Sequence, residues 1–88
     1  ASQFHDHLLQ YVYQQRHAAA YTGQPQAVAV DTVQTPGGIQ WLRRTPLGFA
    51  ASGYPSRAGT LSFRSSGQTY AIVIVPASGA IRHEIRRL

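Results

Sequence analysis

Mostly apolar side chains recur at steps of three and four residues along the first quarter of the chain. The positions are Phe4, Leu8, Tyr11, Val12, Gln15 and Ala19, and Leu9, Tyr13 and Ala20 widen the stripe. This spacing predicts an amphipathic α-helix over about residues 3–21. Ser2 is a suitable N-cap, and Gly23 followed by Pro25 predicts the end of the helix.

After Gly23 the period changes to two, which predicts β-strands separated by turns. The strands are expected at about residues 26–30, 39–43, 47–51, 60–64, 69–75 and 80–85. Ser65-Ser66-Gly67 is a tight-hairpin signal, and Gly79 is expected to supply a positive φ in the last turn. Residues 52–56 are expected to form a loop.

Two strand patterns give more specific expectations. The strand at 69–75 is almost entirely apolar and β-branched, so we expect it to be central and covered on both faces. In the strand at 39–43, alternation places Ile39, Trp41 and Arg43 on one face. The predicted core consists of Leu8, Val12, Val28, Val30, Trp41, Leu61, Phe63, Ile72 and Ile74.

One helix followed by a run of antiparallel strands predicts an α+β fold. We expect residues 1–88 to form a single domain. Its amphipathic N-terminal helix would pack on an antiparallel sheet of about four to seven strands, in one sheet or split into two small ones.

The charge of the chain is strongly positive. All eight basic residues are arginines, and Asp6, Asp31 and Glu84 are the only acids, so the net charge is +5 and the pI about 10.5. Such a balance is typical of proteins with a polyanionic partner. The alternative is an arginine bias that comes from a GC-rich genome.

The sequence offers little for catalysis, metals or cofactors. It has no cysteine, no Gly-x-Ser-x-Gly motif and no phosphate-binding loop, and its three acids leave little for acid–base chemistry. His5 and His7 are two residues apart, which on a helix directs them to different sides. We therefore expect exposed or interfacial histidines, no bound metal, no cofactor and no enzymatic activity.

The arginines are the candidate binding residues, because guanidinium forks match phosphate groups. In the last strand, alternation places Arg82, Glu84 and Arg86 on one face and His83, Ile85 and Arg87 on the other. The candidates for DNA contact are Arg82, Arg86, Arg87, Arg43, Arg44 and Arg64. The alternative is a solvated basic face, or arginines that pair with acids on neighbouring subunits.

Several short segments follow one another in a characteristic order. They are Arg16-x-x-x-Ala20, Leu47-x-Phe49-x-x-x-Gly53, Gly59-Thr60-Leu61-Ser62-Phe63, Tyr70-Ala71-Ile72-Val73-Ile74 and Ser78-Gly79-Ala80-Ile81-Arg82. Their order and spacing resemble the GspH/FimT-type minor pilins and pseudopilins over nearly the whole chain. The chain departs from the family pattern at Ala80, where the family has an arginine.

The resemblance implies a minor pilin of a type IV pilus-like filament, a structural subunit whose partners are other pilins. Some family members bind DNA through arginines of the last hairpin and tail during natural transformation, which implies DNA as a further partner. A type II secretion minor pseudopilin is one alternative, and a free-standing basic nucleic-acid-binding module is another.

The resemblance also implies a location in the cell envelope. A hydrophobic helix upstream of Ala1, preceded by a prepilin cleavage site, would anchor the subunit in the inner membrane. The head domain would then lie in the periplasm before it enters the pilus or pseudopilus.

Overall fold

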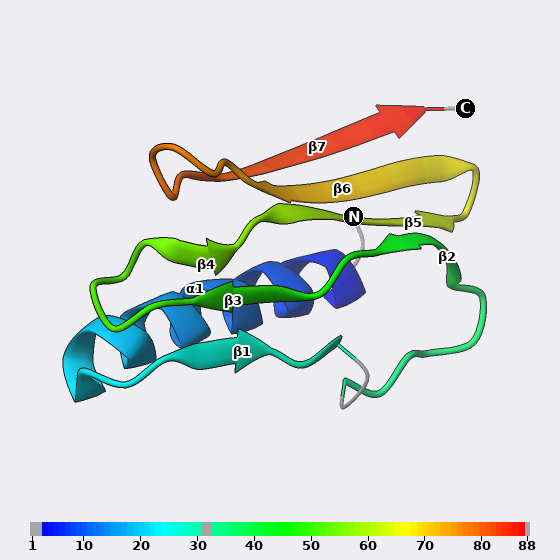
Figure 1. Cartoon of the computed structure of the whole chain (residues 1–88). Coiled ribbons are helices and arrows are strands. Elements are labelled where there is room, and N and C mark those ends of the chain that lie inside the picture. Colours follow the sequence, from blue (N-terminus) through cyan, green and yellow to red (C-terminus); the bar gives the residue numbers. More distant parts are fainter. Residues whose placement is uncertain (1–2, 31–32, 88) are drawn as a thin grey trace.

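The computed structural model describes residues 3–30 and 33–87, with only the backbone of Arg87. Helix α1, Gln3–Thr22, precedes all of the strands (Figure 1). The strands are β1 Gln26–Val28, β2 Gln40–Arg44, β3 Leu47–Phe49, β4 Pro55–Arg57, β5 Gly59–Ser65, β6 Gln68–Ile74 and β7 Ile81–Arg87. The expected N-cap Ser2 lies outside the described residues.

The strands form two antiparallel sheets on which α1 packs, which confirms the α+β fold expected from the sequence. One sheet has the order β1-β3-β4 and the other the order β2-β5-β6-β7. Strand β3 follows β2 closely and β5 follows β4, so one long hairpin passes through both sheets. Where it passes between them, a Cβ atom added to Gly59 would lie 2.6 Å from Thr45 Cγ2, so the close approach requires glycine.

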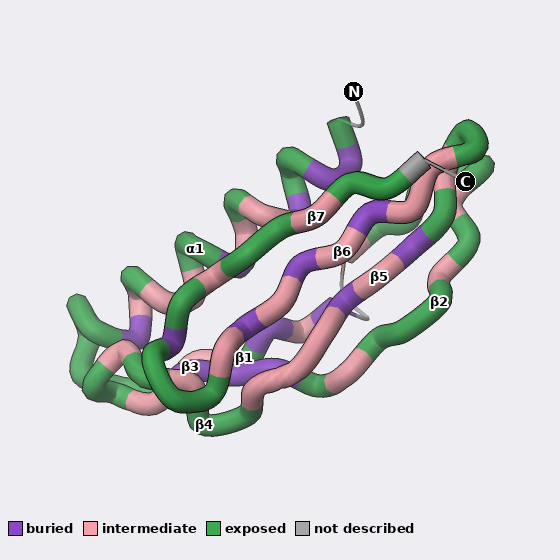
Figure 2. Tube along the Cα trace, turned by 90° about the horizontal axis from the view of Figure 1, so that it is seen from above, coloured by how far each residue is buried: buried purple, intermediate pink, exposed green. Residues whose placement is uncertain are grey.

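Helix α1 buries the apolar stripe that its sequence predicted. The buried side chains of the stripe include Phe4, Leu8, Val12 and Ala19. Their buried partners on the strands and in the segment after β1 are Val28, Val30, Leu47, Phe49, Leu61, Phe63, Tyr70, Ile72 and Ile74. Buried and less buried positions alternate along β6 and in the middle of β5 (Figure 2), as expected for strands with one covered face.

An aromatic cluster holds the first turns of α1 on the four-stranded sheet. The Phe4 ring meets the rings of Trp41 and Phe63 edge-on, at centroid distances of 5.8 and 5.1 Å. Tyr70 stacks on Phe63 at 5.1 Å and lies 5.2 Å from the ring of His5. Each such aromatic pair contributes about 0.5–1.5 kcal/mol beyond the area it buries, so the cluster fixes the position of the helix.

Side chains of α1 also cover the edge of β1 that has no strand beside it. The Gln15 Nε2 group donates a hydrogen bond of 2.8 Å to the Ala27 carbonyl. The Ala29 amide donates to the Tyr11 hydroxyl at 3.2 Å. These bonds occupy backbone groups that would otherwise be open to another strand.

The expected turn signals are confirmed. The helix ends at Thr22, and the Gly23 amide donates to the Ala19 carbonyl at 3.0 Å. Ser66 and Gly67 both have positive φ and connect β5 to β6 in a two-residue hairpin. Gly79 has a φ of 71°, as predicted for the turn before β7.

Several strand boundaries differ from the prediction. Strand β1 ends at Val28, two residues early, while β7 extends to Arg87 and β3 ends at Phe49. The prediction of a loop over residues 52–56 is wrong for its last two residues, because Pro55 begins β4. Proline is tolerated there as the first residue of a strand at a sheet edge, where its missing N–H costs no ladder bond.

The prediction that Trp41 and Arg43 share a face is also wrong. Trp41 pairs with Phe63, but Arg43 pairs with Ser62, the very next residue of β5 toward its start. The extra residue in β2, Leu42, forms a β-bulge that directs Trp41 inward and Arg43 outward. Trp41, expected in the core, is only half-buried beside it.

Strand β6 is covered on one face and not, as expected, on both. Tyr70, Ile72 and Ile74 are buried, whereas Ala71 and Val73 are half-buried on the opposite face. Within the described residues no second layer lies on that face. Small and β-branched side chains, shielded by the neighbouring strands, account for the apolar sequence there.

His5 was expected at the surface or an interface, but it is 2% exposed. Its ring lies 5.5 Å from that of His83 and 6.4 Å from that of Phe63. Burial lowers the pKa of His5, and a positive charge on His83 would lower it further. Asp6, whose Oδ1 lies 3.7 Å from His5 Nδ1, opposes this shift. The neutral form of His5 is therefore the form that the fold favours.

We expect Leu8→Ala to lower the free energy of unfolding by about 2–5 kcal/mol, because Leu8 is fully buried in the core that α1 forms with the strands. Urea titration followed by circular dichroism would measure the change. Tyr21→Ala is the control on the same helix, because Tyr21 is 84% exposed; we expect a change within about 0.5 kcal/mol. Equal losses for the two variants would contradict the described packing.

We expect the free energy of unfolding to fall as the pH drops below about 6.5, where the unfolded chain protonates His5 but the folded chain resists it. The His5 contribution is fully present above that pH and declines toward the lowered pKa of the folded state. Denaturation at pH 8 and pH 5 would measure it. His5→Leu should reduce the difference in unfolding free energy between the two pH values. His7→Leu, at an exposed histidine, should leave that difference unchanged. Identical pH profiles for His5→Leu and the parent would argue against the buried neutral imidazole.

Candidate nucleic-acid interface

The outer face of the four-stranded sheet, turned away from α1, gathers four of the arginines. Residues that pair directly across antiparallel strands point to the same face, so the register assigns each side chain to a row. One row contains Gln40, Arg64, Thr69 and Arg86. The next contains Arg43, Ser62, Ala71 and Glu84, and a third contains Thr60, Val73 and Arg82. We call Arg43, Arg64, Arg82 and Arg86 the arginine face.

The spacing of the arginine face follows from sheet geometry. Arg64 and Arg86 lie two strands apart, about 10 Å between backbones, and Arg82 and Arg86 lie about 13 Å apart along β7. Apart from Glu84, the side chains between them are small or uncharged, so the long arginine side chains extend beyond their neighbours. The Arg82 and Arg86 side chains are 65% and 78% exposed.

Glu84 is the one acid that the register places among these arginines within the described residues. Its carboxylate lies 3.6 Å from Arg82 Nη2 and 3.5 Å from Arg86 Nη2. Ion pairs this exposed contribute little to stability, and they leave most of the donors of both guanidinium groups available. Four positive groups against one negative group leave the arginine face with a strong positive field.

The other predicted arginines are placed differently. Arg44 pairs with Leu61, on the inner side, and its guanidinium carbon lies 5.4 Å from the centre of the Trp41 ring. This contact is a cation–π interaction that covers the half-buried Trp41. Arg87 lies at the end of β7, and its side chain lies outside the described residues.

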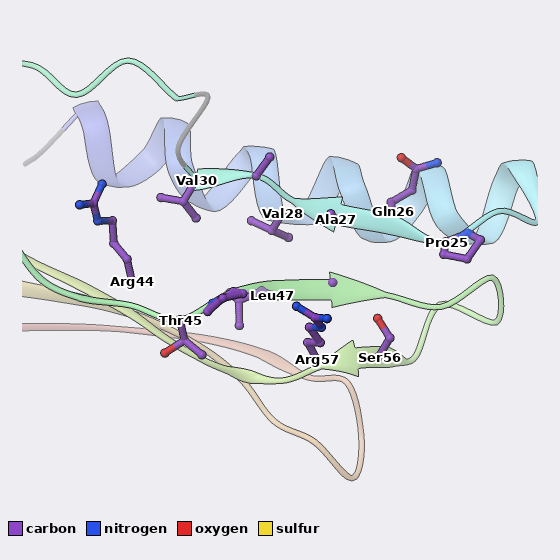
Figure 3. A pocket seen from close by; sticks show the side chains of 13 residues that line it. Pro25, Gln26, Ala27, Val28, Val30, Arg44, Thr45, Leu47, Ser56 and Arg57 are labelled. Carbon is purple, nitrogen blue, oxygen red and sulfur yellow. The ribbon is translucent and has the colours of Figure 1, made fainter.

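Arg57, which sequence reasoning left out of the candidate list, lies on the three-stranded sheet. It lines a groove of about 530 Å³ along β1, β3 and β4, together with Arg44 and the apolar residues Val28, Val30 and Leu47 (Figure 3). In Figure 3, Arg44 lies at one end of this groove and Arg57 beside Ser56. No carboxylate or imidazole lines the groove in the described part of the chain, so it lacks an acid–base pair.

The chemistry that the arginine face offers is the binding of anions by charge and hydrogen bonding. Each guanidinium presents five N–H donors in a fork that matches phosphate oxygens, and it stays charged at any physiological pH. The arginine face spreads these groups over three strands, so it fits a polyanion whose charges repeat along its length.

Among residues 3–30 and 33–87, no group of three or more histidine, cysteine or acidic side chains is arranged to hold a metal ion. Within the same residues, no helix is both long enough and apolar enough to cross a membrane.

Comparisons of the chain with protein-family models, with curated proteins and with solved structures found no match.

Proposed function

We propose that this domain binds DNA through the arginine face, mainly by contacts to phosphates and without strong dependence on base sequence. The observation that supports this proposal best is the register of the four-stranded sheet, which directs Arg43, Arg64, Arg82 and Arg86 to one exposed face. These residues come from three different strands, so the charge is spread over a surface and not confined to the chain terminus.

Phosphate contacts suit this surface better than base recognition. Base recognition in the major groove needs an element that enters the groove, usually a helix or a two-stranded ribbon. Here the helix is packed behind the sheet, and the arginines project from a broad face. Contacts of this kind position a protein on nucleic acid without reading its sequence.

We further propose that the domain is the head of a minor pilin in a type IV pilus-like filament. The resemblance of the segments from Arg16 to Arg82 supports this role, and so does the order of a leading helix followed by antiparallel strands. The arginine face is turned away from α1, so DNA and neighbouring subunits that contact the helix would not compete for the same surface.

We expect the logarithm of the DNA association constant to fall with the logarithm of salt concentration, with a slope of about −3 to −4 on duplex DNA. This slope corresponds to about 0.9 per neutralised phosphate for the arginine face. Arg64→Gln should make the slope shallower by about 1 and weaken binding at every base sequence. Fluorescence anisotropy with labelled oligonucleotides at several salt concentrations would measure both.

Arg16→Gln is the matched control, because it removes the same charge from α1, on the opposite side of the sheet. It should leave the slope nearly unchanged. Equal effects of Arg16→Gln and Arg64→Gln would show that only net charge matters. No binding by the parent at low salt would rule out the DNA proposal.

The filament role is tested in cells that produce the full-length protein. We expect it in the filament fraction sheared from the cell surface, and in the membrane fraction when the prepilin peptidase is deleted, because an uncleaved prepilin stays in the inner membrane. Immunoblotting of both fractions is the measurement. A full-length product found only in the soluble cell extract of both strains would contradict the filament proposal without bearing on DNA binding.

A further inference from the structure

Strand β7 is a long sheet edge that the fold leaves open. It lies at one end of the four-stranded sheet, and β6 is the only strand among the described residues that pairs with it (Figure 1). By contrast, α1 covers the free edge of β1: the Ala27 carbonyl accepts a hydrogen bond from Gln15, and the Ala29 amide, just after β1, donates one to Tyr11. Strand β4 is only three residues long. An edge of seven residues without such cover is a ready template for another strand.

The hydrogen-bond alternation determines which backbone groups of β7 face outward. The Val75 amide donates to the Ala80 carbonyl at 2.9 Å, which makes these two residues a hydrogen-bonded pair. Hydrogen-bonded and non-hydrogen-bonded pairs alternate along an antiparallel ladder, so Arg82, Glu84 and Arg86 bond to β6. The N–H and C=O groups of Ile81, His83 and Ile85 therefore point to the open edge.

The side chains along this edge divide into a mainly apolar row, with one histidine between two isoleucines, and a charged row. Ile81, His83 and Ile85 are on the same face as the buried Ile74, Ile72 and Tyr70. Ile85 is nevertheless 52% exposed, because the sheet ends there and no neighbour covers its outer side. The opposite face carries the alternating charges of Arg82, Glu84 and Arg86.

We propose that β7 pairs antiparallel with β7 of a second copy of this chain, about a two-fold axis at His83. In this register Ile81 lies opposite Ile85 of the other copy, and Ile85 opposite its Ile81. On the other face Arg82 lies opposite Glu84 and Glu84 opposite Arg82. The outward N–H and C=O groups of Ile81, His83 and Ile85 each gain a hydrogen-bond partner. Isoleucines then face isoleucines on one side of the sheet, and arginines face glutamates on the other.

The charges argue against the nearest alternative registers. An axis at Glu84 would place two glutamates opposite each other and Arg82 opposite Arg86, and like charges directly opposite destabilise a sheet. An axis at Ile85 would leave Ile81 and Arg82 with few partners or none, since the strand ends at Arg87. The axis at His83 pairs residues 81–85 of the two copies and places Arg86 opposite Ala80, so no arginine or glutamate faces a like charge.

This pairing has a geometric consequence for the arginine face. A two-fold axis between antiparallel strands runs perpendicular to the sheet, so both α1 helices lie on one side and both arginine faces on the other. The two four-stranded sheets then become one continuous sheet. The inference does not depend on DNA binding, and its test contains no DNA.

The test is sedimentation equilibrium of the domain over concentrations from about 10 µM to about 1 mM, because a single strand pair makes a small and weak interface. We expect a reversible monomer–dimer equilibrium in this range. Arg82→Glu and Glu84→Arg should each weaken dimerisation at least about tenfold, because each places like charges opposite one another twice in the two-fold pair.

Mixing the two single variants should restore a dimer. In the mixed pair, position 82 of each copy again faces an opposite charge at position 84 of the other copy. The double variant Arg82→Glu/Glu84→Arg should dimerise like the parent for the same reason. Arg64→Glu, which makes the same charge change on β5, is the control and should leave the equilibrium nearly unchanged.

Because the chain has no cysteine, one introduced thiol reports the register directly. The Cα atoms of a hydrogen-bonded antiparallel pair lie about 5.5 Å apart, within disulfide range. We expect His83→Cys to cross-link with itself under mild oxidation, and Ile85→Cys to do so less. A parent that stays monomeric up to about 1 mM, or a mixture of single variants that fails to associate, would overturn the proposal.

Discussion

The contact on which the rest of the structure depends is the docking of α1 on the inner faces of both sheets. Neither sheet could bury its apolar side chains alone, because each has few strands and, within the described residues, no second sheet packs against either face. The helix provides Phe4, Leu8 and Val12, which are buried in one cluster with Phe63 and Ile72 of the large sheet and Phe49 of the small one. The strands place apolar side chains on their inner faces because this contact buries them.

The outer face follows from the same constraint. Because the period of a strand is two, fixing Leu61, Phe63, Tyr70 and Ile72 inward fixes Ser62, Arg64, Thr69 and Ala71 outward. Nothing within the described residues covers that face, so it carries polar and charged groups at little cost. The arginine face is therefore the solvent side of the surface whose other side is the core. At β7 the sheet ends, and the two sides of the sheet meet at an open backbone edge.

Much of the fold could be predicted from the sequence, because local patterns determine it. The apolar stripe with a period of 3.6 residues predicted the end of the helix to within one residue. The turn at Ser66-Gly67 predicted that β5 pairs with β6. Features that depend on contacts distant in sequence were missed. The bulge at Leu42 arises where β2 meets β5, and alternation within residues 39–43 could not reveal it.

The candidate site was predictable in its residue type and less so in its arrangement. The alternation in β7 indicated that Arg82 and Arg86 share a face, but only the register places them beside Arg64 and Arg43. Arg44 was expected with these residues and instead covers Trp41. The bulge at Leu42 reverses the face to which the following residues of β2 point, so Arg44 points inward. The burial of His5 depends on Tyr70 and His83, which lie far along the chain, so its helical position alone did not indicate it.

The central claim is that the two faces of the large sheet have separate roles, the inner one in folding and the outer one in binding a polyanion. Amide chemical-shift mapping of the isotope-labelled domain with a short duplex oligonucleotide tests this claim most directly. The account predicts that the largest shifts cluster at Ser62, Arg64, Thr69, Ala71 and Arg86. Shifts concentrated on α1 and β1, with the outer rows unchanged, would contradict it.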